Sequence, residues 1–148
     1  MSDALDRLLA GEVAPDVYRY GSRANAAGIV ERAEEAGWRC VVLPGRDIGS
    51  KAALLNALSQ ALSFPDWVGH NWDALLDALR DQSWAPAQRG YLLIWERAGR
   101  LAWAEPETFA TALAVLRDAV AYWRGTATPF AVLVRGPGCA WRTLPRLA

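Results

Sequence analysis

The sequence predicts an α/β fold in which helices pack against a small parallel β-sheet. Two observations lead to this expectation. Segments with apolar residues at helical spacing alternate along the chain with short segments that are apolar at nearly every position. A segment that is apolar at nearly every position is expected to be a strand buried on both faces. Such strands are typical of parallel sheets whose strands are connected through helices. The predicted order of elements is β-α-β-α-α-β-α-β.

The candidate elements can be placed from these patterns. The expected strands lie at residues 17–20, 39–43, 91–95 and 130–134, and the expected helices at 23–36, 51–62, 72–80 and 106–124. Ser22 and Ser50 stand where helix N-caps belong, and Pro106 fits the first position of a helix. Gly37 and Gly125 each follow a predicted helix, where a left-handed backbone conformation ends it.

Three segments lie outside this pattern. Residues 1–15 carry leucines at helical spacing and form either a short docked helix or a loose arm. Residues 96–104 are expected to be a connecting loop that holds Trp103. The tail, residues 136–148, contains no acids and is expected to be coil that wraps the surface through Trp141.

The composition excludes several classes of protein. The 16 basic and 16 acidic residues give a net charge of zero, so no overall field points to nucleic acid or to a membrane surface. No segment approaches the roughly 20 apolar residues of a membrane span, and the N-terminus carries acids where a signal peptide needs bases. We therefore expect a cytoplasmic protein that contacts neither a membrane nor nucleic acid directly.

The residues of common catalytic and metal sites are missing. His70 is the only histidine, and Cys40 and Cys139 are far apart in the chain, so no zinc ligand set is evident. No glycine-rich phosphate loop and no nucleophile motif occur. Asp73 and Asp77 could formally act as the carboxylate pair of a hydrolase, but adjacent turns of one exposed helix do not enclose a site. We expect a protein that is not an enzyme and that needs no cofactor or metal.

The most informative stretch is FPDWVGHNWDALLDALRDQSW, residues 64–84. It predicts a tight loop, punctuated by proline and glycine, and then a short helix with Asn71 as its N-cap. Asp73 and Asp77 are four residues apart and therefore lie side by side on this helix. The opposite side of the helix is expected to be buried through Trp72, Leu75, Leu76 and Leu79.

Two interpretations of this stretch remain open. Acidic pairs on helices are usually just solvated, and Trp67 and Trp84 could lie in the core as well as at the surface. An acidic helix face flanked by exposed tryptophans is instead typical of an interface with another protein. Residues 64–84 contain four acids and one arginine, a local charge of −3 in a neutral chain, which favours a basic partner surface.

A resemblance to a known family rests on the ungapped pattern FPxWxGxNWDALxDxL, which begins at Phe64. This pattern resembles the signature of the barstar family, intracellular inhibitors of the secreted ribonuclease barnase. The resemblance extends more weakly over about residues 39–135. It implies a single barstar-like domain over residues 1–148, with an N-terminal extension that includes an extra βα unit (1–37), a core (38–135) and a basic tail (136–148).

The resemblance also implies a function, which is to plug the active site of a barnase-like ribonuclease. In that family the enzyme is contacted by a loop aromatic, two helical aspartates, a tryptophan after the helix and an acid on the long helix. The partner-binding residues implied for this chain are Trp67, Gly69, Asn71, Asp73, Asp77, Trp84 and Asp118. Asp77 would mimic a phosphate.

This chain departs from the family pattern in three ways. It is neutral and has an extra N-terminal segment, its loop aromatic is Trp67 rather than tyrosine, and Asp118 stands where the family has glutamate. A second hypothesis is therefore a non-inhibitory binding module with a barstar-like fold and a different protein partner. The partner's charge separates the two, because an inhibitor of this kind needs a basic catalytic cleft.

Overall fold

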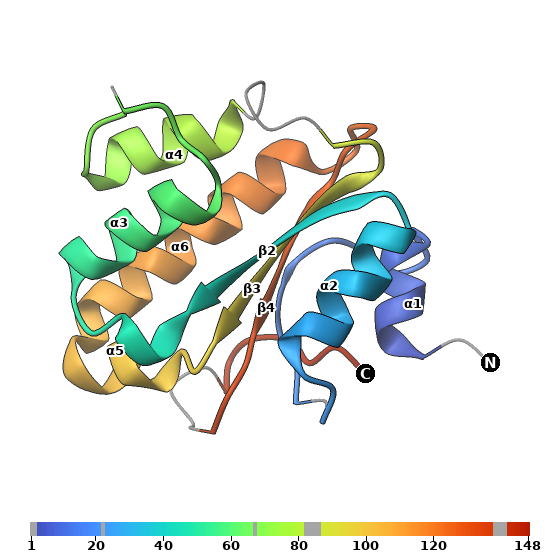
Figure 1. The fold of residues 1–148 in the computed structure, drawn as a ribbon, viewed down its shortest axis with the longest axis horizontal. Helices are drawn as coiled ribbons and strands as arrows, with labels where there is room; N and C mark the ends of the chain where they lie inside the picture. The colour runs from blue at the N-terminus through green and yellow to red at the C-terminus, as the bar shows by residue number, and fades with distance from the viewer. Residues whose placement is uncertain (1–2, 22, 67, 82–86, 138–141) are drawn as a thin grey trace.

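Four parallel strands form a single sheet at the centre of the structure (Figure 1). The computed structural model describes residues 3–21, 23–66, 68–81, 87–137 and 142–148. In sheet order the strands are β1 (Val17–Arg19), β4 (Phe130–Val134), β3 (Gly90–Glu96) and β2 (Trp38–Pro44). The predicted α/β architecture with a parallel sheet is confirmed, and the strand order, which the sequence left open, is β1-β4-β3-β2.

The two central strands are buried because helices cover both faces of the sheet. Every residue of β4 is buried, and every residue of β3 except Glu96 at its end. Their register places Tyr91 beside Phe130 and Trp95 beside Val134. Such strands have no solvated face, which explains why they are apolar at every position rather than at every second one.

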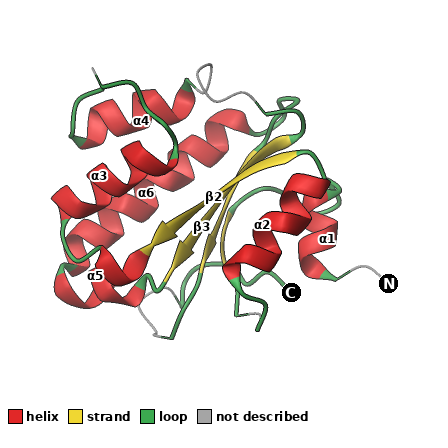
Figure 2. Ribbon diagram, viewed as in Figure 1, coloured by secondary structure: helices red, strands yellow, loops and turns green. Residues whose placement is uncertain are grey.

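The helices of the described residues cover the two faces unequally (Figure 2). One face carries α3 (Lys51–Ala61), α5 (Gly99–Ala104) and α6 (Pro106–Trp123), with α4 (Trp72–Arg80) packed on α6, and the other carries α1 (Ala4–Leu9) and α2 (Ala26–Glu35). Leu93 and Trp95 point into the larger core beneath α3 and α6, whereas Leu92 and Ile94 point into the smaller core beneath α2. None of the helices described is long and apolar enough to cross a membrane.

Several predicted element ends are confirmed by their local geometry. The Ser50 hydroxyl accepts a hydrogen bond from the Ala53 N–H (3.1 Å) and caps α3. Gly37 and Gly125 have φ angles of +86° and +81°, the left-handed conformation that ends a helix and favours glycine. Pro106 is the first residue of α6.

The start of α2 differs from the prediction. The helix begins at Ala26 rather than at residue 23, because the Asn25 side chain accepts a hydrogen bond from the Gly28 N–H (2.8 Å) and supplies the N-cap. Ser22, the predicted cap, lies outside the described residues. Asparagine caps helices about as well as serine, so residue type gave no reason to prefer Ser22 over Asn25.

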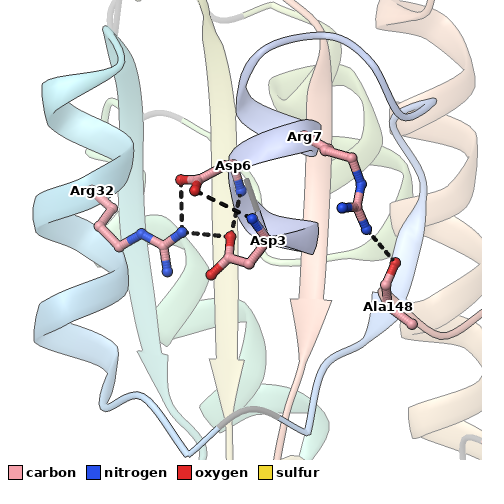
Figure 3. Close-up of polar contacts among 5 residues, drawn as sticks. All are labelled: Asp3, Asp6, Arg7, Arg32 and Ala148. Atoms are coloured by element: carbon pink, nitrogen blue, oxygen red, sulfur yellow. Dashed lines mark hydrogen bonds and ion pairs between the residues drawn. The ribbon is translucent and has the colours of Figure 1, made fainter. Parts of the chain in front are cut away.

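The N-terminal segment contains a docked helix rather than a loose arm. Leu5, Leu8 and Leu9 of α1 are buried in the smaller core. Arg32 of α2 forms ion pairs with Asp3 (2.6 Å) and Asp6 (2.7 Å), as Figure 3 shows. The hydrogen bond from Arg32 lowers the pKa of Asp3 below its ordinary value of 3.8, so this contact is fully formed at neutral pH.

The C-terminal tail is held against the sheet instead of only wrapping the surface. Leu144 and Leu147 are buried. The Arg19 N–H donates to the Pro145 carbonyl (2.9 Å) and the Leu147 N–H donates to the Arg19 carbonyl (3.0 Å). The tail therefore covers part of the outer edge of β1. Trp141, expected to mediate the wrapping, lies outside the described residues.

The expectation of a connecting loop over residues 96–104 is wrong. Residues 99–104 form α5, whose Leu101 and Ala102 are buried in the larger core. This helix has six residues and no side-chain N-cap, so neither its period nor its start leaves a clear pattern in the sequence. Trp103 is on this helix and is 89% exposed.

The pairing of Asp3 with Arg32 predicts a small dependence of stability on pH. A carboxyl group with a lowered pKa in the folded state contributes stability above its ordinary pKa and loses it as the pH falls through the folded value. We expect Asp3→Asn, which keeps the helix cap, to lower the free energy of unfolding by less than about 1 kcal/mol at neutral pH. Urea unfolding at pH 7 and pH 3 would test this, since the difference in stability between the two proteins should be smaller below the ordinary pKa of 3.8. A difference that does not shrink at the lower pH would contradict the assignment.

The packing of α4 predicts different costs for truncating two of its leucines. Leu79 is fully buried, so Leu79→Ala is expected to lower the free energy of unfolding by about 2–5 kcal/mol. Leu76 is half-buried, and Leu76→Ala is expected to cost roughly half of that or less. Urea denaturation of both variants measures the difference, and equal losses would show that the buried side of α4 is wrongly assigned.

Candidate functional site

The acidic helix predicted from the sequence is α4, and its first turn is built around Asn71. The Asn71 side chain accepts a hydrogen bond from the Ala74 N–H (2.8 Å), which confirms the predicted N-cap. Gly69 leaves room for this cap, because a Cβ atom there would lie 3.2 Å from Asn71 Nδ2. The left-handed residue that turns the chain before this loop is Ser63 (φ +56°), not Gly69.

The inner side of α4 differs in part from the predicted apolar face. Leu75 and Leu79 are buried as expected, but Ala78 is buried as well. Trp72 and Leu76 are only half-buried. The reason for the shift is that α4 packs against one side of α6 rather than flat on the sheet, so residues at the margin of its apolar stripe stay partly in solvent.

A hydrogen bond fixes the position of α4 on α6. The indole N–H of Trp123, near the end of α6, donates to the backbone carbonyl of Leu79 (2.8 Å). The ring of Trp123 also lies 5.7 Å from the ring of Tyr91 on β3. The last turn of α4 is thereby connected through Trp123 to the centre of the sheet, and the solvent-facing side of α4 is held in one orientation.

The outer side of α4 presents two free carboxylates. Asp73 and Asp77 are exposed, and no residue within the described ranges forms an ion pair or hydrogen bond with either side chain. Asp73 lies in the first turn, where the positive end of the helix dipole stabilises a negative charge. Asp77 lies one turn later and has no such compensation, so its charge is available to a partner.

Arg80 and Tyr122 extend this outer side, and the sequence interpretation did not identify them. Arg80 follows Asp77 by three residues, which places it on the same side of the helix. Its guanidinium lies 5.7 Å from the centre of the Tyr122 ring, a cation–π distance. Tyr122 is 54% exposed and packs edge-on against Trp123. The spacing of Arg80 from Asp77 could have predicted its place, but the contact with Tyr122 joins residues far apart in the chain.

Of the other predicted site residues, the structure describes Asp118 but not the two tryptophans. Asp118 is exposed on α6, one helical turn before Tyr122 and therefore on the same side of that helix as Tyr122. Trp67 and Trp84, the two flanking tryptophans, lie outside the described residues. The structure thus places Asp118 on the same side of α6 as Tyr122, the ring that contacts Arg80.

The chemistry of this surface is that of an anionic binding face. Among the described residues, no group of three or more His, Cys, Asp and Glu side chains is arranged to hold a metal ion. The carboxylates of Asp73 and Asp77 are exposed on the outer side of α4. Such a surface suits contact with cationic groups of another molecule.

The part of the chain that matches a known family includes this region. A family model described as Barstar (barnase inhibitor) matches residues 38–135, which is 98 of the 148 residues. A search of curated proteins found no match. The matched segment begins with β2, includes α4 and α6 with the acidic residues described above, and ends just after β4. On this evidence the chain belongs to the barstar family.

Proposed function

We propose that the chain binds a barnase-like ribonuclease and blocks its active site with the outer side of α4. The observation that carries the proposal is that the carboxylates of Asp73 and Asp77 are exposed and form no ion pair or hydrogen bond with any residue the structure describes. They lie on adjacent turns of a helix whose position is fixed by α6. The family description, a barnase inhibitor, supports a ribonuclease as the partner.

The physical basis is the mimicry of phosphate by carboxylate. A ribonuclease active site is lined with cationic groups arranged to bind phosphate, and a carboxylate can form the same charge-assisted hydrogen bonds. The charge of −3 carried by residues 64–84 also accelerates association with a basic cleft. In this account Asp77 occupies the phosphate position, as the resemblance to the barstar family implies.

The remaining predicted residues would support this contact from both sides of α4. Gly69 and Asn71 shape the loop and start the helix, Trp67 and Trp84 flank the acids in the sequence, and Asp118 would add a carboxylate from α6. The proposed role is therefore binding without catalysis, and it requires neither metal nor cofactor.

A different protein partner is the second candidate function, and Arg80 is the observation that favours it. The guanidinium of Arg80, which is held by Tyr122, would be repelled by a cleft that is basic throughout. A partner with an acidic group opposite Arg80 would match the whole surface better. An inhibited ribonuclease can itself carry such a group, so the two candidates differ in whether the partner's catalysis is blocked.

The proposed role of Asp77 predicts a large loss of inhibition on neutralising it. We expect Asp77→Asn to weaken inhibition of a barnase-like ribonuclease by more than about 2 kcal/mol, as for a buried charged hot spot. The measurement is the inhibition constant obtained from hydrolysis of a fluorogenic RNA substrate. Because the side chain is exposed and has no ion pair with a described residue, the melting temperature should not fall.

The matched control is Glu31→Gln on α2, which removes one exposed negative charge from the opposite face of the sheet. We expect it to change the inhibition constant by less than about 0.5 kcal/mol, since remote surface charges are screened. If both variants inhibit equally well, Asp77 is not the anchor. Tight binding of the wild-type chain without loss of ribonuclease activity would favour the second candidate.

A further inference from the structure

Arginines collect in the four segments that follow the four strands. These segments, residues 20–25, 45–50, 97–104 and 135–148, contain seven arginines and one acid, Asp47, a charge of +6. Because all four strands are parallel, their carboxyl ends lie at one edge of the sheet. We call this surface the carboxyl edge. The net charge of zero therefore conceals a strong segregation of charge.

Contacts join these segments into one surface. The buried guanidinium of Arg135, just after β4, donates to the Ala24 carbonyl in the first segment and pairs with Glu96 (2.6 Å) at the end of β3. A Cβ atom at Gly136 would lie 3.1 Å from the Arg97 Cα. The backbones after β1, β3 and β4 are thus held together.

The segment after β2 is held against the same surface. A Cβ atom at Gly45 would lie 1.8 Å from the Glu96 carbonyl oxygen, so the two backbones touch. A Cβ atom at Gly49 would lie 3.0 Å from Nε of Arg100, whose guanidinium therefore packs over this loop. The described parts of all four segments therefore meet at the carboxyl edge.

All but one of the seven arginines of this edge are exposed, Arg135 being buried. Those that are exposed are Arg23, Arg46, Arg97, Arg100, Arg142 and Arg146. No acidic residue within the described ranges forms an ion pair with any of the six. Two nearby acids are already engaged, Glu96 with Arg135 and Glu105 as acceptor from the Lys51 N–H and the Thr108 hydroxyl, whereas Asp47 and Glu107 are exposed. Arg97 also holds a left-handed φ of +47°, a strained conformation of the kind that clusters at functional sites.

An exposed aromatic ring borders the arginines. Trp103 follows Arg100 by three residues on α5, so the two side chains leave the same side of the helix. Trp103 is 89% exposed. A groove of about 270 Å³ lies between α5, α6 and the tail, and its lining includes Ala102, Phe109, Leu113, Arg117 and Thr143. Mostly apolar side chains with one guanidinium and one hydroxyl suit a planar, partly polar group such as a nucleobase.

We propose that the carboxyl edge binds single-stranded RNA. Guanidinium groups along the edge contact the phosphates, and Trp103 provides a stacking surface for an unpaired base. Cationic grooves combined with exposed aromatic rings are the shared feature of proteins that bind single strands without sequence preference. The carboxyl ends of the strands are also where open parallel sheets bind their ligands. Figure 1 places α4 at the other end of the molecule from the strand arrowheads and α5, so this surface is separate from the acidic side of α4.

The test is fluorescence polarisation of a labelled oligouridine of about 12 nucleotides, titrated with the full chain. If four phosphates are neutralised, raising the salt from about 50 to about 200 mM weakens binding roughly 50-fold. Arg97→Glu and Arg142→Glu are each expected to weaken binding roughly fivefold or more and to lower the salt dependence. Trp103→Ala is expected to weaken binding about tenfold through lost stacking.

Matched controls lie at the other end of the molecule. Arg89→Glu reverses an exposed arginine before β3, and Tyr122→Ala removes an exposed aromatic from α6; neither should change RNA binding more than twofold, and neither should Asp77→Asn. Equal losses from Arg89→Glu and Arg97→Glu, or no salt-dependent binding, would overturn the proposal. Competition by polyglutamate as strong as by unlabelled oligouridine, with Trp103→Ala unaffected, would overturn it in favour of an acidic protein partner.

Discussion

The packing of α4 on α6 is the contact on which the candidate site depends. A helix laid directly on the sheet would be covered by its neighbours, but α4 lies outside α6 and turns a full side to solvent. Burial of Leu75, Ala78 and Leu79 supplies the attraction, and the hydrogen bond from Trp123 to the Leu79 carbonyl sets the position. These contacts leave Asp73 and Asp77 exposed and hold the side of α4 that carries them in one orientation. A helix that is already held in place loses less entropy when a partner binds.

Charge segregation is the second general feature of the molecule. The chain has as many basic as acidic residues, yet arginines dominate the carboxyl edge and aspartates the outer side of α4. The sequence-based expectation of no contact with nucleic acid rested on the net charge, which averages over both surfaces. A neutral protein with separated charges can present one surface to a basic protein and another to an anionic polymer. The two surfaces hardly affect each other, because exposed charges further apart than a Debye length of about 8–10 Å are largely screened.

The features that sequence alone predicted are those that depend on residues close together in the chain. The Asn71 cap, the position of Asp73 and Asp77 on adjacent turns of one helix, and strand β4 all follow from local spacing. The structure has these features where they were expected. The half-burial of Trp72 and Leu76 was not predicted, because it depends on the angle at which α4 meets α6. Helix α5 was missed because six residues without a cap leave no clear period. The sequence could not predict the strand order, because buried parallel strands have similar patterns that do not identify their neighbours. It therefore could not predict that the segments carrying Arg23, Arg46, Arg97 and Arg142 lie at one edge of the sheet.

The measurement that tests the central claim most directly is titration calorimetry of the chain against a barnase-like ribonuclease, with and without a mononucleotide that fills the nuclease's active site. If α4 enters the catalytic cleft, the two ligands exclude each other. The apparent affinity should then fall in proportion to the occupancy of the mononucleotide, as competition at a single site requires. An affinity that stays the same at saturating mononucleotide would show that the chain binds elsewhere on the nuclease and would contradict the account.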